Sequence, residues 1–260
     1  MNRRVLYKYR TGESTIGTMV SRSSRSKPPV ADAPAPAPAP TNRTPGPGRP
    51  KDPGKRAAIL AAAKAMFTRL GFDGASMDQI AAEAGVSKLT VYSHFGDKES
   101  LFAAAVQSHC DTGLPSDLFE PAGEAQPVRE RLLSIAEALF SMISSHEALA
   151  GHRMLCSPQL VGSPLAHLFW EAGPQRVQDN IARVLARRMA SGELAIGDGG
   201  EQALHRAATQ LCALLKGELH AMLVLGCCEP EREAIRTHLE AAVDVFLRAY
   251  APSADSTGDP

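Results

Sequence analysis

Hydrophobic side chains recur at three- and four-residue spacing along most of the chain after Asp52, which is the period of an amphipathic helix. The pair Asp52-Pro53 favours a helix start, because an Asp side chain accepts hydrogen bonds from free backbone N–H groups and proline suits the first turn. Gly71 is typical of a helix end. We therefore expect a first helix between Asp52 and Gly71. Its apolar positions are Ile59, Leu60, Ala63, Phe67 and Leu70.

Three further helices are predicted before residue 113. Ser76 and Gln79 form the S-x-x-Q pattern of a capping box, so a short helix begins there and ends in a turn at 84–86. A third helix is expected from Ser87 to about residue 96. Asp97 then caps a fourth helix. The apolar stripe of that helix is Leu101, Phe102, Ala105 and Val106.

The helical pattern continues beyond Gly113. We expect helices at about 127–148, 151–158, 164–172, 175–191, 200–226 and 231–250. The expected separators are Gly162, Gly173-Pro174, Gly192, Gly197 to Gly200, and Gly226 to Pro230. The sequence has no alternating strand pattern and no internal repeat, so it predicts an all-α protein.

The segment from Ser76 to His94 has the pattern of a helix-turn-helix. Ala81 and Ala82 are small enough for two helices to approach closely, and Gly85 suits the positive φ of the turn. The inward positions after the turn are Val86, Val91 and Phe95. The outward positions are Ser87, Lys88, Leu89, Thr90, Tyr92 and His94. Short hydrogen-bond donors and a cation thus lie at the start of a helix that can enter a major groove.

These residues carry a family resemblance. The segments GRPKD (48–52) and AAILAAAKAMFTRLGFDGASMDQIAAEAGVSKLTVYSHFGDKESLF (57–102) resemble the DNA-binding domain of TetR/AcrR-family regulators. The resemblance implies that 87–94 is the recognition helix, that Lys88, Leu89 and Thr90 lie near base edges, and that Thr90, Tyr92, His94 and Lys98 hold the DNA backbone. Ser76 of the capping box and Ser87 at the start of the third helix complete the expected DNA-binding set. The family further implies a homodimer on a palindromic operator and an inducer pocket in the C-terminal helices.

The segment Gly48-Arg49-Pro50-Lys51 also resembles the core of an AT-hook. In such a motif an arginine lies in a narrow A·T minor groove. Arg49 is therefore a further candidate DNA contact, although isolated G-R-P triplets are a weak signal.

The second half of the chain, from Arg153 to Tyr250, resembles the C-terminal domain of AefR-like members of the same family. In that family the last two long helices form a four-helix bundle between two protomers. The corresponding apolar residues here are Leu211, Leu215, Leu219 and Met222 in one helix and Leu239, Val243 and Phe246 in the other. The alternative interpretation is that these stripes pack within one chain.

A ligand pocket is expected between the C-terminal helices, since apolar pockets with a few polar groups occur between the helices of bundles. The candidates are Met142, His146, Met154, Phe169, Trp170 and His220. Ordinary core packing is the alternative for each.

Charged residues are unevenly distributed along the chain, although its 28 basic and 28 acidic residues cancel overall. Residues 1–56 carry a net charge of +9, residues 57–110 of −1, and residues 111–260 of −8. The Pro/Ala-rich composition of 1–51 predicts a disordered basic tail. We expect a DNA-binding domain at 52–112, an effector-binding and dimerisation domain at 113–251, and a second disordered tail at 252–260.

Several classes of function are disfavoured. We find no stretch that reads as membrane-spanning, no secretory signal, and no disulfide or metal-ligand spacing among five cysteines and eight histidines. Known catalytic and cofactor motifs are missing too, so neither an enzyme nor a cofactor is expected. The sequence predicts a cytoplasmic regulator with three partners: operator DNA, a second copy of itself and a small apolar inducer. A repressor is the expected form, and an architectural minor-groove binder acting through the tail is the alternative.

Overall fold

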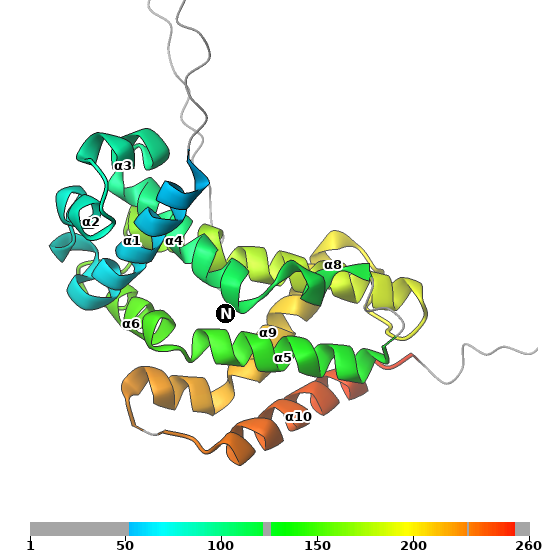
Figure 1. The fold of residues 1–260 in the computed structure, drawn as a ribbon. Coiled ribbons are helices and arrows are strands. Elements are labelled where there is room, and N and C mark those ends of the chain that lie inside the picture. The colour runs from blue at the N-terminus through cyan, green and yellow to red at the C-terminus, as the bar shows by residue number, and fades with distance from the viewer. Residues whose placement is uncertain (1–51, 122–125, 228, 253–260) are drawn as a thin grey trace, which may run out of the picture. The chain divides into compact units, whose positions relative to one another are not determined.

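The computed structural model describes residues 52–121, 126–227 and 229–252, and every regular element among them is helical (Figure 1). In chain order these are α1 (Pro53–Gly74), α2 (Met77–Glu83), α3 (Lys88–Phe95), α4 (Lys98–Gly113), the 3-10 helix η1 (Ser116–Phe119), α5 (Val128–Ile143), α6 (His146–Leu155), α7 (Pro164–Trp170), the π-helical turn η3 (Glu171–Gln175), α8 (Arg176–Ala190), α9 (Glu201–Leu225) and α10 (Arg232–Ala249). The all-α prediction is confirmed. Apart from Pro252, the two expected tails lie outside the described residues.

The N-terminal helices begin where their caps predict. The Asp52 carboxylate accepts from the backbone N–H of Gly54 at 2.9 Å, and Asp97 accepts from that of Ser100 at 2.7 Å. Ser76 and Gln79 form both hydrogen bonds of the capping box. The helix α1 continues to Gly74, past the expected end at Gly71, where a φ of 71° interrupts the helical geometry.

The helix predicted over 127–148 is two helices. Ser145 is the N-cap of α6, and its side-chain oxygen accepts from the backbone N–H of Ala148 at 3.2 Å. Because a serine side chain competes for backbone N–H groups, it favours a new helix start over continuation of the old one. The helix expected at 151–158 is correspondingly α6, at His146–Leu155.

The break predicted at Gly173-Pro174 is wrong. The chain passes from α7 to α8 through the π-helical turn η3, which contains Pro174. Proline lacks an N–H and crowds the carbonyl four residues earlier, and a locally widened turn accommodates both effects. Gly173 permits close packing there, since a Cβ at this position would lie 3.1 Å from Cγ1 of Val106 in α4.

Two hydrophobic clusters form the core. One includes Ile59, Phe67 and Phe102 of the first four helices together with Leu155 and Leu165 of α6 and α7. The other joins side chains of α5, α8, α9 and α10, and Figure 1 shows α10 alongside α5 and α9. The α6–α7 region thus contributes to the core of the N-terminal helices.

The structure corrects the expected dimer stripe. Five of its seven side chains are buried within the chain, each no more than 2% exposed, and pack in the second cluster. They are Leu211, Leu215, Leu239, Val243 and Phe246; Leu219 and Met222 are half-buried. Side chains already covered by their own chain cannot form the surface that meets a partner, so the alternative interpretation holds for these five.

The helix α9 has two features that the sequence interpretation missed. It bends at Gly217, whose φ of 48° and ψ of −157° are not helical. It is also the one helix among the described residues that is long and apolar enough, by length and composition alone, to cross a membrane. In this structure its buried side chains pack against α5, α6, α8 and α10.

Candidate DNA-binding surface and effector cavity

The turn between α2 and α3 fixes the direction of α3. Gly85 has a φ of 64°, as the turn requires, and the backbone N–H of Val86 donates to the carbonyl of Ala81 at 3.0 Å. Ser87 then caps α3, since its hydroxyl accepts from the backbone N–H of Thr90 at 3.2 Å. Val91 is fully buried and anchors α3 to the core.

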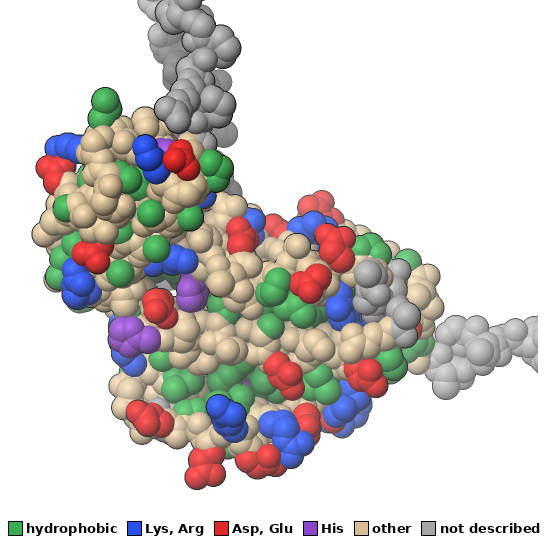
Figure 2. All heavy atoms as spheres, in the orientation of Figure 1, with side chains coloured by type: hydrophobic (Ala, Val, Ile, Leu, Met, Phe, Trp, Pro, Cys, Tyr) green, Lys and Arg blue, Asp and Glu red, His purple; other side chains and the backbone are tan. Residues whose placement is uncertain are grey.

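The outward face of α3 carries most of the predicted DNA-contact residues. Leu89 is 78% exposed and Tyr92 is 42% exposed, although both are large and apolar or aromatic. Figure 2 shows hydrophobic and basic side chains together at the surface over α2 and α3. Because a monomer gains nothing by exposing a leucine at a helix start, this face is suited to contact with another molecule.

Lys88 lies on the same face and is paired within the chain. Its Nζ is 2.8 Å from a carboxylate oxygen of Asp78 in α2, and the hydrogen bond to this carboxylate raises the pKa of Lys88. Both side chains are more than half exposed. An exposed pair of this kind contributes little to stability, so Lys88 can exchange Asp78 for a base or a phosphate.

Lys98 has a different environment from the one predicted. Its ammonium donates to the carbonyls of Phe72 at 2.9 Å and Ala75 at 3.0 Å, and it lies 4.3 Å from the centre of the Phe72 ring. These contacts join the start of α4 to the end of α1. Lys98 therefore holds the helix-turn-helix segment in place.

His94 presents one ring nitrogen outward. Its Nδ1 is buried without a hydrogen-bond partner among the described residues, and the ring lies against Phe95. A buried unpaired N–H costs more than a buried unpaired lone pair, so the favoured tautomer carries its proton on Nε2. That proton is the one available to a phosphate.

Two predicted DNA-contact residues remain, Ser76 and Arg49. Ser76 is engaged in the capping box of α2, and Arg49 lies outside the described residues. Sequence reasoning missed Arg56, whose guanidinium lies 5.2 Å from the centre of the Phe95 ring and so places a cation beside the end of α3. Its position in the first turn of α1 gave no signal of this packing.

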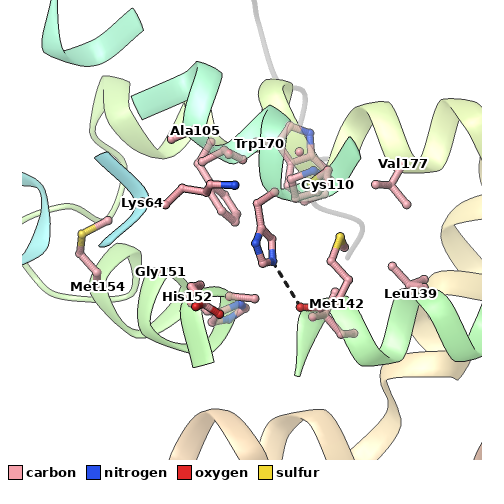
Figure 3. A pocket seen from close by; sticks show the side chains of 18 of the residues that line it. Lys64, Ala105, Cys110, Leu139, Met142, Gly151, His152, Met154, Trp170 and Val177 are labelled. Carbon is pink, nitrogen blue, oxygen red and sulfur yellow. Dashed lines mark hydrogen bonds between the residues drawn. The ribbon is translucent and has the colours of Figure 1, made fainter. Parts of the chain in front are cut away.

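A cavity of about 270 Å³ lies among α1, α4, α5, α6, α7, α8 and α9 (Figure 3). Five of the six predicted pocket residues line it, namely Met142, Met154, Phe169, Trp170 and His220. His146 does not line the cavity and is exposed at the start of α6. Sequence reasoning missed most of the polar lining. The missed polar residues include Lys64, His109, His152, Gln178 and Lys216.

The cavity is in direct contact with the helix-turn-helix segment. Lys64, Phe67 and Thr68 of α1 line one side of it. Met154 of α6 both lines the cavity and accepts, through its sulfur, a hydrogen bond from the backbone N–H of Phe72 at 3.1 Å. A molecule in the cavity would therefore touch the helix that supports α2 and α3.

Burial controls the charge state of several lining groups. It lowers the pKa of His220 to about 4, with smaller contributions from His152 and Lys216, and it also lowers the pKa of His152. It raises the pKa of the Cys110 and Cys212 thiols to about 11. At neutral pH these two histidines and two thiols are therefore uncharged.

Comparison with known proteins agrees with this geometry. Residues 59–105 match the family described as bacterial regulatory proteins, tetR family, and residues 130–252 match the AefR-like transcriptional repressor C-terminal domain. The flavonoid-responsive regulator FrrA is 32% identical, and its structure aligns over 77% of this chain and 98% of FrrA with a TM-score of 0.60. The chain belongs to the TetR family of transcriptional regulators.

Two further relatives illustrate the range of similarity. A regulator from Mesorhizobium loti is 28% identical and aligns over 76% of this chain and 96% of its own, with a TM-score of 0.63. The transcriptional activator FasR of Mycolicibacterium smegmatis is 36% identical over 110 residues, which are 42% of this chain and 49% of FasR. The chain thus matches about half the length of this curated relative. All these relatives are named as regulators, which supports a regulatory rather than an enzymatic role.

Proposed function

We propose that this protein is a transcriptional repressor that binds a palindromic operator as a homodimer through α3 and releases it when a small molecule fills the cavity. One observation carries the proposal: the same cavity is lined by α1 and α4, which pack against α2 and α3 of the helix-turn-helix segment, and by helices of the C-terminal half. The relative FrrA is named as flavonoid-responsive, which supports a regulator that answers to a small organic molecule.

In this proposal the exposed start of α3 reads the bases. Lys88, Leu89 and Thr90 face base edges, and the helix N-terminus favours a phosphate through its free N–H groups. Tyr92 and Nε2 of His94 contact the backbone. Ser76 and Ser87 keep their capping roles, and Lys98 is a positioning residue, because both carbonyls that it binds lie at the end of α1.

Release follows from differential affinity. A ligand changes an equilibrium only if it binds one conformation better than the other. The cavity wall includes α1, so a ligand can bind better when α1 is shifted relative to α6. Such a ligand also favours a dimer in which the distance between the two α3 helices is different. Repressors of this type require recognition helices about 34–36 Å apart to meet successive major grooves.

The homodimer requires a face other than the buried stripe. We assign it to the outward surface of α10, where Ala234, Ala241 and Val245 are exposed at helical spacing, together with the neighbouring exposed Ala213 of α9. Val245 is 44% exposed. Figure 2 shows acidic and basic side chains in the region of α10, and such side chains are usual at the rim of an interface.

The dimer face has a direct test. Val245→Glu places a charge in the proposed interface and is expected to shift the protein from dimer to monomer in sedimentation velocity. Val161→Glu is the matched control, because Val161 is a 66% exposed valine between α6 and α7. A Val245→Glu protein that sediments like the wild type would refute this face.

The function itself is tested by selecting operators from random duplexes with the purified full chain. A palindromic site should emerge, and its affinity should fall steeply with salt because phosphate contacts release counterions. Sequence-independent binding would contradict the proposal. A reporter gene behind the selected site then gives the sign of regulation: deletion of the regulator should raise expression from a repressed promoter, whereas a fall would indicate an activator, as FasR is named.

A further inference from the structure

The helices α9 and α6 bring one group of polar side chains to the cavity. Cys212, Lys216 and His220 recur every four residues along α9, and all three line the cavity. His152 of α6 lines it as well, and its ring centre lies 5.5 Å from that of His220. An ammonium and two imidazoles therefore line the cavity from these two helices, while Lys64, His109 and Gln178 line it from others.

Lys216 supplies an uncompensated positive charge. It is half-buried, and no carboxylate among the described residues lies within ion-pair distance of it. Its charge is among the causes that lower the pKa of both His152 and His220, which line the same cavity. The ionisable lining groups are Lys64, His109, Cys110, Glu147, His152, Cys212, Lys216 and His220. Of these only Glu147 is acidic near neutral pH, and it is exposed.

Gln178 of α8 is a second, independent sign that a polar ligand group belongs here. It lines the cavity and is only 5% exposed, and none of the hydrogen bonds among the described residues involves its amide. The amide is not among the fully buried unpaired polar atoms, so the little surface that it keeps is open to the cavity, where water or a ligand can satisfy it.

We propose that the cavity binds an amphipathic organic acid whose anionic oxygen, a carboxylate or a phenolate, lies against Lys216 and the His152–His220 pair. The carbon skeleton then packs against the apolar walls, which include Phe102, Phe169 and Trp170, and Gln178 donates to a second oxygen. This inference rests on the proposal that the cavity is the effector site, and it replaces a purely apolar inducer with an acidic one.

Other ligand classes fit the lining less well. A cationic ligand would meet the positive charge of Lys216 in a site that disfavours even protonated histidine. A purely apolar ligand would remove water from Lys216 and Gln178 and give them no partner. Among the described residues no group of three His, Cys, Asp or Glu side chains could hold a metal ion, so the histidine pair lacks a third ligand.

The test uses the full chain without DNA, so that a failure of operator binding cannot affect it. Trp170 is the only tryptophan and lines the cavity, so its fluorescence reports occupancy. Two matched pairs serve as probes: decanoate with decanol, and 2,6-difluoro-4-hexylphenol, whose fluorines make it acidic enough to ionise near neutral pH, with its methyl ether. We expect at least one acidic member to bind about tenfold more tightly than its neutral partner, as a hydrogen bond to a charged group implies. Which of the two acids shows this preference distinguishes a carboxylate site from a phenolate site.

Two variants test whether Lys216 causes the preference for acidic probes. Lys216→Met keeps the length of the side chain and is expected to remove the acid preference while decanol binding stays unchanged. Lys55→Met is the control, since Lys55 is an exposed lysine of α1 that does not line the cavity. Equal binding of acid and neutral probes, no binding of any probe, or an acid preference that survives Lys216→Met would each overturn the inference. Equal binding would still leave the cavity as an effector site, and so would separate this failure from that of the proposed function.

Discussion

Burying individual polar side chains beside the cavity costs the folded protein free energy. His220 is 8% exposed, and burial holds its pKa at about 4, well below the ordinary value of 6.5. His152 and Lys216 add to this effect from α6 and α9. A buried imidazole that stays neutral contributes through packing and hydrogen bonds rather than charge, and His220 has both, against His152 and the backbone of Ile143.

The lowered pKa of His220 makes folding sensitive to acid. Between about pH 6.5 and 4 the unfolded chain binds a proton that folded His220 does not, so stability falls as pH falls and the loss is complete below the folded pKa. His220→Gln should flatten the fall of the thermal unfolding midpoint from pH 7 to pH 4. His146→Gln is the control, because His146 is exposed and should leave the slope unchanged. Equal slopes in wild type and His220→Gln would contradict the assignment.

Leu89 offers the sharpest test of base reading. A 78% exposed leucine at the start of α3 is suited to the methyl group of thymine, which is the apolar feature of the major groove. Leu89→Ala should weaken binding to the selected operator by about 1–2 kcal/mol, since part of a leucine side chain loses its burial. Replacing the contacted thymine with deoxyuridine removes the methyl group alone. If the two changes together cost no more than either one, Leu89 reads that methyl group; additive losses would show that it does not.

At the scale of elements, local signals predicted most of the fold. Asp52, Ser76, Ser87 and Asp97 cap the first four helices as their side chains predict, because an N-cap is decided by hydrogen bonds within three residues. The break at 144–145 and the passage through Pro174 were missed. The break has a local signal, the N-cap Ser145, which the apolar periodicity concealed. The passage through Pro174 depends on how η3 packs against α4, which periodicity along one segment does not contain.

The residues of the candidate sites divide in the same way, into those that a local pattern predicts and those that only the packing of helices brings together. The face of α3 could be predicted because a short motif fixes it, and five of the six pocket residues line the cavity. Lys216 and Gln178 could not be assigned, since a polar residue on a helix is ordinarily solvated. Only the four-residue spacing of Cys212, Lys216 and His220 could have drawn attention to that side of α9.

The bend of α9 is a property of one glycine. A Cβ on Gly217 would lie 2.4 Å from Cε1 of His238, and its positive φ disfavours any other residue. Gly217→Ala is expected to lower the free energy of unfolding by about 1–3 kcal/mol, the usual cost of such backbone strain. Gly151→Ala in α6 should instead raise it by about 0.5–1 kcal/mol, because alanine is the better helix former there and meets no atom within 4 Å. Urea denaturation measures both, and equal effects of the two variants would refute this account of the bend.

At the scale of the whole molecule, charge and specificity are carried by different parts of the chain. Residues 1–51 hold ten basic and two acidic residues, whereas residues 57–110, which include α2 and α3, carry a net charge of −1. Attraction to phosphate grows with the number of cations, but it does not depend on sequence. In the proposed function, recognition of a site depends instead on the few side chains that face base edges, such as Lys88 and Leu89.

Deletion of residues 1–51 separates these two contributions. The truncated chain keeps α1 to α10 and is expected to select the same palindrome, with a weaker affinity and a shallower slope of log K against log salt, because each lost phosphate contact reduces that slope by about 0.9. Fluorescence anisotropy with the operator and a scrambled duplex, at several salt concentrations, measures both quantities. A shallower slope with an unchanged ratio of the two affinities assigns specificity to α3. Loss of discrimination between the duplexes would instead support an architectural protein that binds through its basic tail, because in that case removing Arg49 and its neighbours removes the reading element itself.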